Sequence, residues 1–328
     1  MNLDTVRDEI DAAVTRLKPH SNYLRETPLL KLPGSAFNIH CAEVWLKLEQ
    51  MQVGGSFKAR GMLNRMLANP IPKSGVIVAS GGNAGIATAA AARALGVPCE
   101  VFVPTVSSAA KQAKLRELGA TVVVTGAAYF DALQACIARQ QATGALMTHA
   151  YDQIEVVAGA GTLAREIEMQ AGVPHSVLVS VGGGGLIGGV AAWFAGRSRV
   201  IALESEHTPT LFAARKAGQP VDVAVSGIAA DSLGAKRIGN IGWEITQRHA
   251  DGGAPLVADS APLVADALLV SDGSIRAAQQ WLWTHLRLAV EPAAALGLAA
   301  LQTGVYAARA DEKVCLILCG GNVDLASF

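Results

Sequence analysis

Residues 54–61 read Gly-Gly-Ser-Phe-Lys-Ala-Arg-Gly, and the rest of the chain is arranged around them. The two glycines interrupt the preceding segment, Ser56 can cap a helix, and an apolar-periodic helix is expected to follow. Lys58 then lies in the first turn, although a lysine is ordinarily unfavourable at the positive end of a helix dipole. An anionic aldehyde cofactor at that place would explain it, because the amine could form a Schiff base. The alternative is an ordinary surface lysine at a solvated helix start.

The composition bounds the kind of protein. With 328 residues, 51% of them hydrophobic, the chain can bury one large core or two moderate ones. Lysine plus arginine and aspartate plus glutamate number 27 each, so no basic surplus drives binding to nucleic acid or to a membrane surface. The five cysteines show no metal-binding spacing, which suits a reducing compartment. Without a signal core or an apolar run of ~18 residues, we expect a cytoplasmic protein with no membrane or nucleic-acid partner.

Short apolar runs alternate with amphipathic helices in two regions of the chain. In the first region, an expected strand over 75–79 is followed by a glycine-rich turn and an alanine-rich helix over 83–95. The second region repeats this pattern from an expected strand over 176–181 to a closing strand over 313–318. Between them, residues 220–266 are expected to be loop-rich with short helices. The alternation predicts an α/β fold in which crossover helices join parallel strands.

Three glycine-rich turns follow expected strands. Residues 79–85 offer backbone N–H groups, the Ser80 hydroxyl and the Asn83 amide, which together can hold a carboxylate. The four glycines of 182–185 let the backbone wrap a tetrahedral anion such as phosphate. The third turn, 319–322, closes the last strand. Because ligands of open α/β sheets bind at the carboxyl ends of strands, all three turns can face one crevice.

Each turn has a plainer interpretation as tight-turn chemistry between a strand and a helix. The four glycines only loosely resemble a dinucleotide-binding fingerprint, because Ile187 breaks the GxGxxG spacing. A Walker phosphate loop is excluded, since no Gly-Lys-Ser or Gly-Lys-Thr follows. A nucleotide-binding oxidoreductase and a ligand-binding protein without catalysis therefore stay open as alternatives at this point.

Taken together, the segments resemble the pyridoxal-phosphate enzymes of the threonine/serine dehydratase group, relatives of serine racemases and, more distantly, of cysteine synthases. The resemblance runs from about Thr27 to the C-terminus, and the segments that carry it are 55–61, 80–85, 159–162, 182–185, 290–292 and 319–322. It implies fold type II, with two domains that are each a twisted, mostly parallel sheet flanked by helices. Residues 1–52 and 154–328 would form the large cofactor domain, and 53–153 the small domain that carries Lys58 and the substrate-carboxylate loop. It also implies a homodimer.

The resemblance assigns roles residue by residue. Lys58 would be the Schiff-base lysine and the catalytic base, Phe57 would pack against the pyridine ring, and Asn83 would hydrogen-bond the ring's 3-hydroxyl. The phosphate would be held by Gly182, Gly183, Gly184, Gly185 and Leu186. The substrate carboxylate would be held by Ser80, Gly81, Gly82, Asn83 and Ala84. Cys319 would meet the ring nitrogen, where a thiol does not make the ring a full electron sink and therefore favours β-elimination.

The reaction implied is α,β-elimination of a small hydroxy-amino acid such as L-threonine or L-serine to a 2-oxo acid and ammonia. Gly81 narrows the choice, because serine racemases carry at this position a second serine that can reprotonate the substrate. The alternatives are a serine or hydroxy-amino-acid racemase and a dehydratase for 3-hydroxyaspartate or phenylserine.

A cation site is also implied, for K⁺ or a divalent ion. The ligands would be the Glu204 carboxylate and the carbonyls of Thr208, Leu233 and Ala235, because hard cations prefer oxygen. Thr210 stands where some relatives have an aspartate, which argues against a divalent ion. Since the sequence ends soon after Asn322, we expect no C-terminal regulatory domain and no allosteric control by isoleucine.

Overall fold

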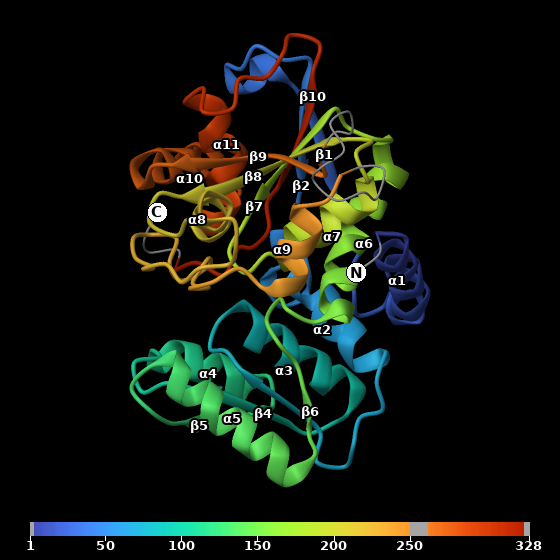
Figure 1. Cartoon of the computed structure of the whole chain (residues 1–328), viewed down its shortest axis with the longest axis vertical. Coiled ribbons are helices and arrows are strands. Elements are labelled where there is room, and N and C mark those ends of the chain that lie inside the picture. Colours follow the sequence, from blue (N-terminus) through green and yellow to red (C-terminus); the bar gives the residue numbers. More distant parts are fainter. Residues whose placement is uncertain (1–2, 250–261, 325–328) are drawn as a thin grey trace.

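Two β-sheets organise the residues that the computed structural model describes, 3–249 and 262–324 (Figure 1). The larger sheet contains β1 (Leu29–Pro33), β2 (Glu43–Lys47), β7 (Ser176–Ser180), β8 (Arg199–Ser205), β9 (Val264–Val270) and β10 (Lys313–Ile317), in the order β1-β2-β10-β7-β8-β9. The smaller contains β3 (Val76–Ala79), β4 (Cys99–Val103), β5 (Thr121–Val124) and β6 (Leu146–Met147), in the order β5-β4-β3-β6. Only the β1–β2 pair is antiparallel among these neighbours. The predicted α/β fold with mostly parallel sheets is confirmed.

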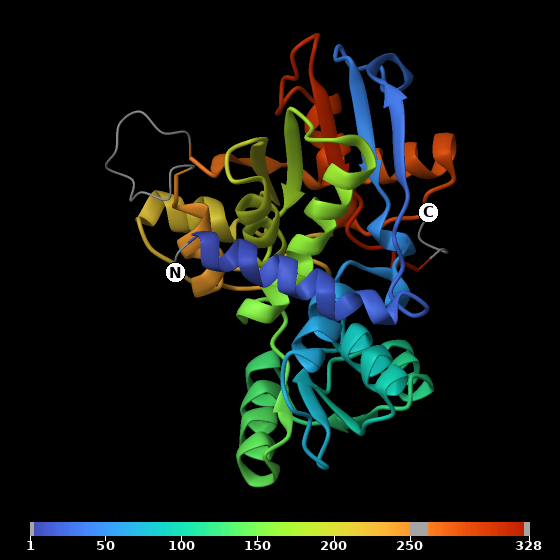
Figure 2. The ribbon, with the colours of Figure 1, turned by 90° about the vertical axis from the view of Figure 1, so that its right-hand side faces the viewer.

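The helices cover both sheets. They are α1 (Leu3–Leu17), α2 (Lys58–Leu67), α3 (Asn83–Leu95), α4 (Ala109–Glu117), α5 (Tyr129–Thr143), α6 (Ile154–Ala171), α7 (Gly185–Phe194), α8 (Thr210–Ala217), α9 (Asn240–Thr246), α10 (Asp272–Leu286) and α11 (Pro292–Gln302). Figure 1 shows α3, α4 and α5 around the smaller sheet, with α10 and α11 on the opposite side of the larger sheet from α6 and α7. Figure 2 shows α1 crossing below the larger sheet, where it packs against α2, α6 and α7.

The strands β3 to β6 lie inside the range 53–153, and the other strands lie outside it. Helix α2 falls in the same range, yet it packs against α1 and α6 as well as α3. The division of the chain into residues 1–52 plus 154–328 and residues 53–153 stays a prediction. No helix in the described part of the chain is both long and apolar enough to span a bilayer.

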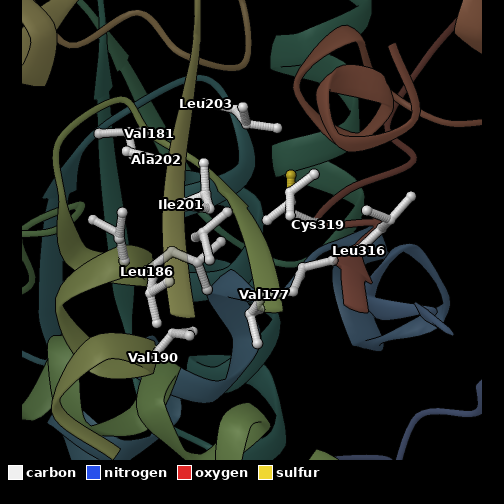
Figure 3. Packing of buried hydrophobic residues seen from close by; sticks show 14 of the residues in the cluster. Val177, Val181, Leu186, Val190, Ile201, Ala202, Leu203, Leu316 and Cys319 are labelled. Atoms are coloured by element: carbon white, nitrogen blue, oxygen red, sulfur yellow. The ribbon is translucent and has the colours of Figure 1, made fainter. Parts of the chain in front are cut away.

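The core of the larger sheet explains the continuous apolar runs in the sequence. All residues of β7 and most of β8 are buried, because helices cover both faces of a parallel sheet. Figure 3 shows Val177 of β7 and Ile201 of β8 beside Leu186 and Val190 of α7. The same view places Cys319, just beyond β10, at the edge of this apolar layer.

One part of the expected pattern was incomplete and another was wrong. The stretch 220–266, expected to be loop-rich with short helices, also contains the start of β9, and residues 250–261 within it lie outside the described residues. Strand β9 pairs in parallel with β8 and supplies the end of the larger sheet, which the short polar interruption at Asp266 had hidden. Ser56 does not cap α2: Phe57 is at the N-cap position, without a side-chain capping bond.

Glycines bring three helices into backbone contact. A Cβ on Gly159 of α6 would lie 2.6 Å from the Cα of Gly61 on α2. A Cβ on Gly189 of α7 would lie 2.5 Å from the backbone nitrogen of Gly161 on α6. Only glycine allows such an approach. The 159–162 motif therefore fixes how closely α2, which begins at Lys58, lies against α6.

A buried ion cluster ties α2 to the larger sheet. The Arg60 guanidinium, 2% exposed, donates to both carboxylate oxygens of Glu49, at 2.8 and 2.7 Å. It also donates to both oxygens of Glu166 on α6, at 2.9 and 3.0 Å. Lys47, at the end of β2, donates to Glu166 and to the carbonyl of Thr27. The two cations, Arg60 and Lys47, thus balance the charges of the two anions, Glu49 and Glu166, in the interior. Arg60 lies only two residues after Lys58.

Arg60→Ala should lower the free energy of unfolding by about 3–5 kcal/mol, because it leaves the Glu49 carboxylate buried without its cation. Urea denaturation followed by circular dichroism measures this. Arg139→Ala, which removes an ion pair of Arg139 and Glu100 near the surface, is the control and should change stability little. An Arg60→Ala protein as stable as the parent would contradict the role given to the cluster.

Candidate active site

The three glycine turns and the start of α2 are linked to one another. The turn after β10 lies against the segment before Lys58, since Ser56 and Gly320 form a bridge and the Phe57 N–H donates to the Cys319 carbonyl at 3.1 Å. The Gly321 N–H donates to the Gly55 carbonyl at 2.9 Å. The turn after β3 joins them through Asn83, whose Oδ1 accepts from Asn322 Nδ2 at 2.7 Å. Two of the three turns therefore meet beside the start of α2, and the tetraglycine turn is connected to Lys58 through residues 150–152.

Lys58 is the first residue of α2 and is partly buried. Its Nζ lies 2.5 Å from the carbonyl oxygen of Ala150, in the segment that leads into α6. Burial lowers the pKa of Lys58 to about 8, although the neighbouring Cys319 and Glu291 oppose this shift. A substantial fraction of such an amine is neutral near pH 8, and the neutral amine is the form that attacks a carbonyl or takes a proton.

The tetraglycine turn is shaped as an anion cradle. Gly184 has a φ of 87° and leads into α7, whose first turn leaves N–H groups without intrahelical partners. The carbonyls of Gly182 and Gly183 are occupied by the Thr210 hydroxyl at 2.6 Å and the Gly239 N–H at 3.0 Å. With its carbonyls taken, the turn presents N–H groups, which suits a phosphate at a helix N-terminus.

Tyr151 closes the other side of this cradle. A Cβ on Gly183 would lie 2.1 Å from the Tyr151 ring, and one on Gly185 would lie 3.0 Å from the Tyr151 carbonyl. The next residue, Asp152, accepts hydrogen bonds from the N–H groups of Asn240 and Ile241 at the start of α9. The segment 150–152 thus links Lys58 to the phosphate cradle. This link was not predicted from the sequence, because neither Tyr151 nor Asp152 belongs to a glycine motif.

The turn from Ser80 to Ala84 opens α3, with Gly82 at the N-cap position. The Gly82 N–H lies 3.3 Å from the Ser80 hydroxyl, which holds the turn together. A Cβ on Gly81 would lie 3.1 Å from the hydroxyl oxygen of Ser107, in the loop between β4 and α4. That oxygen is buried and makes no hydrogen bond to any described residue. Ser107 was not predicted, because no sequence motif surrounds it.

Asn83 makes the contacts that join the two sheets. Its Nδ2 donates to both oxygens of Glu291, at 2.9 and 2.8 Å, and its Oδ1 accepts from Asn322 Nδ2 at 2.7 Å. Glu291 lies just before α11 and is 5% exposed, and burial raises the pKa of its carboxyl to about 7. Glu291 and Asn322 lie in motifs that were recognised in the sequence, at 290–292 and 319–322. No role was predicted for either side chain.

Cys319 lies beside Lys58 and is 5% exposed. Burial and the neighbouring Glu291 both raise the pKa of this thiol, so it stays neutral. Phe57 packs at the edge of the apolar layer that contains Cys319. A neutral thiol next to an amine fits the ring nitrogen of a pyridine that is not fully protonated.

Two of the predicted cation ligands, the Glu204 carboxyl group and the Thr208 carbonyl, have hydrogen-bond partners within the protein. Glu204 is fully buried and accepts from the N–H groups of Leu211 and Phe212, both at 2.7 Å. Its Oε1 also lies 2.9 Å from the Thr210 hydroxyl oxygen, whose single proton is shared with the Gly182 carbonyl. The carboxyl group therefore occupies the N-terminus of α8, and burial raises its pKa to about 7 although these hydrogen bonds oppose the shift. The Thr208 carbonyl accepts from the Thr210 N–H at 3.0 Å, and Leu233 lies against Gly182. Within residues 3–249 and 262–324, no three His, Cys, Asp or Glu side chains gather as a metal site.

The ion site at Glu204, Thr208, Leu233 and Ala235 stays a prediction. For the cofactor the residues present fit pyridoxal phosphate: the cradle of N–H groups matches a phosphate, the neutral Lys58 amine matches an aldehyde, and the Cys319 thiol matches a pyridine nitrogen.

Known proteins are similar to this chain in sequence and in fold. Residues 20–320 match the family model described as "Pyridoxal-phosphate dependent enzyme". An L-threonine ammonia-lyase of Thermotoga maritima is 32% identical, over 86% of this chain and 68% of that protein. A phenylserine dehydratase of Ralstonia pickettii is 32% identical, over 99% of this chain and 97% of that protein. The structure of maize serine racemase superposes with a TM-score of 0.84 and 29% identity, over 98% of this chain and 94% of that chain.

Gly183→Ala should weaken the binding of pyridoxal phosphate roughly tenfold or more, because the added methyl group must displace the Tyr151 ring from the cradle. Titration of the apoprotein with pyridoxal phosphate, followed by absorbance, gives the Kd. Gly273→Ala, in α10, is the control, since a Cβ there meets no atom within 4 Å. Equal affinities for the two variants would contradict the assignment of the cradle.

The rate at which the apoprotein gains the visible absorbance of pyridoxal phosphate should rise with pH and level off above about pH 9. The reason is that burial lowers the pKa of Lys58 to about 8, so the reactive neutral amine is nearly complete at that pH. Stopped-flow absorbance at fixed cofactor concentration measures the profile. A rate that still climbs steeply toward the ordinary lysine pKa of about 10.4 would contradict the buried setting of Lys58.

Proposed function

The chain belongs to the pyridoxal-phosphate-dependent enzyme family, and from this premise we propose that it catalyses α,β-elimination on a small hydroxy-amino acid. The products are a 2-oxo acid and ammonia. Within the family, its relatives include threonine ammonia-lyases, dehydratases and serine racemases. The family match sets aside the alternative of an oxidoreductase that binds a nucleotide at the tetraglycine.

The observation that carries the proposal is the pairing of Lys58 with a glycine at position 81. The neutral Lys58 amine, held beside the Ala150 carbonyl, can take the α-proton of a bound amino acid. Gly81 offers no side chain in the turn proposed to hold the substrate carboxylate, so residue 81 itself cannot return a proton. One base without a matching acid at this position favours elimination over racemisation.

The other residues bind and orient. The turn from Ser80 to Ala84 would hold the substrate carboxylate on the N–H groups at the start of α3. Gly182 to Leu186 would hold the phosphate, Phe57 would lie against the ring, and the neutral Cys319 thiol would face the ring nitrogen. When bound, pyridoxal phosphate draws electrons from the α-carbon of the amino acid and so makes its proton removable.

The proton balance of the reaction is simple. Lys58 Nζ accepts the α-proton, and one proton passes to the β-hydroxyl, which leaves as water. The proton lost from the α-carbon therefore leaves with the hydroxyl, and Lys58 returns to the neutral amine. The released enamine shifts a proton to its β-carbon and becomes an imine, which adds water and loses ammonia to give the 2-oxo acid. No outside oxidant or reductant is required.

A second candidate, racemisation, has one observation in its favour. The Ser107 hydroxyl oxygen lies 3.1 Å from the position that a Cβ of residue 81 would occupy, and it is buried without a described partner. A hydroxyl in that space could take the place of the serine that residue 81 lacks. Formation of D-serine from L-serine at a rate similar to elimination, lost in Ser107→Ala, would favour this second function.

Lys58→Ala should lower the release of 2-oxo acid by about 10²–10⁴-fold, because the base is removed, and should abolish the visible absorbance that depends on this amine. We expect the parent protein to release a 2-oxo acid from at least one stereoisomer of threonine, serine, 3-hydroxyaspartate or phenylserine. A coupled assay across these substrates measures both the reaction and the preference. A variant that keeps absorbance and turnover would refute the proposal, and absorbance without turnover in the parent would indicate a binding protein.

A further inference from the structure

The side chains around Asn83 form a hydrogen-bond chain with one direction. Lys114 Nζ, on α4, donates to Asn322 Oδ1 at 2.7 Å. Asn322 Nδ2 donates to the Gly54 carbonyl and to Asn83 Oδ1, both at 2.7 Å. Asn83 Nδ2 donates to the Glu291 carboxyl. This series of hydrogen bonds thus begins at the Lys114 ammonium and ends at the Glu291 carboxyl group.

The groups at both ends decide how the two amides are turned. An ammonium can only donate and a backbone carbonyl can only accept, so Asn322 must turn its Oδ1 to Lys114 and its Nδ2 to Gly54. Asn322 therefore also turns an N–H toward Asn83, and Asn83 must accept it with Oδ1. In this orientation Asn83 turns its Nδ2 to the Glu291 carboxyl group, whose oxygens accept from it at 2.9 and 2.8 Å. Each contact reinforces the next.

Glu291 is itself held in place. Its Oε1 accepts a second hydrogen bond from the backbone N–H of Asn322 at 3.0 Å. A Cβ on Gly320 would lie 2.5 Å from its Oε2, so the glycine leaves room for the carboxyl group. The carboxyl group and the Asn322 amide together contact Asn83 at both ends of its side-chain amide.

We propose that Glu291 and Asn322 are positioning residues that hold the Asn83 amide in one orientation, with Nδ2 as the donor, so that its second N–H serves the 3-oxygen of the pyridoxal ring. One N–H of Nδ2, forked between the two carboxyl oxygens, satisfies Glu291 and leaves the other N–H free for the ring. A donor at this position stabilises the ionised form of the 3-oxygen. If Asn83 were turned over, its carbonyl oxygen would face an anion and repel it.

This inference rests on the proposed function, because it takes Asn83 to face the ring. The test uses Glu291→Gln, which can donate where the carboxylate only accepts, and Asn322→Asp, which removes the donor to Asn83. For each holoprotein without substrate, the measurements are the Kd for pyridoxal phosphate and the pH midpoint of the visible band. We expect roughly tenfold weaker binding and a midpoint moved to higher pH, because the ionised 3-oxygen loses its donor.

Glu312→Gln is the matched control. Glu312 is also a buried glutamate, but it lies before the start of β10, at the opposite end of that strand from the site, where Ser176 donates to it. This variant should lose stability without changing the Kd or the midpoint. If Glu291→Gln fails to fold, Lys114→Met tests the chain from its exposed end and should move the midpoint in the same direction by a smaller amount.

The outcomes separate the two proposals. If the Lys58→Ala variant keeps the visible band of the parent protein, the proposed function is contradicted. If Lys58→Ala loses the band while Glu291→Gln and Asn322→Asp keep the parent's Kd and midpoint, only the positioning role is overturned. A shift of equal size in Glu312→Gln would also overturn it.

Discussion

The burial of Arg60 between Glu49 and Glu166 is the constraint on which the site depends. An arginine taken out of water needs anions on several sides, and these anions come from the segment after β2 and from α6. Helix α2 is thereby fixed to two elements at once, and the glycine contacts with α6 set its distance. Lys58 lies one half-turn before Arg60, so its amine is placed by a cluster that takes no part in the chemistry.

Much of the fold and part of the site could be predicted from the sequence, for a physical reason. Parallel strands covered on both faces must be apolar throughout, and turns that bring the backbone close to an anion must be glycine. The apolar run around Val177 and the glycines at 182–185 and 159 meet these requirements and can be recognised in the sequence. Lys58 was found because a cation at a helix N-terminus is locally unfavourable and calls for an explanation. The expected convergence of the three turns then follows from the parallel sheets.

The remaining features depend on partners far apart in the chain. Glu291 and Asn83 are separated by 208 positions, and no local pattern announces their contact. Ser107 lies in a loop without a sequence motif. Its hydroxyl is of interest only because Gly81 has no side chain and the hydroxyl oxygen lies 3.1 Å from where a Cβ would be. The Glu204 carboxylate matched a ligand position by order in the chain, whereas its partners are the N–H groups of a helix that the sequence did not reveal. Strand β9 was missed because its polar residue interrupts the apolar run.

The order of strands in the larger sheet has a consequence for how the protein is made. Strand β10 is the last described strand in the chain, yet it lies between β2 and β7. During synthesis the two halves of this sheet have no shared neighbour until residues 313–317 leave the ribosome, whereas β3 to β6 are complete about 170 residues earlier, as follows from the element bounds. The smaller sheet can therefore gain structure first, and the active site is completed in one late step, when β10 enters between its neighbours and carries Cys319 and Asn322 into place.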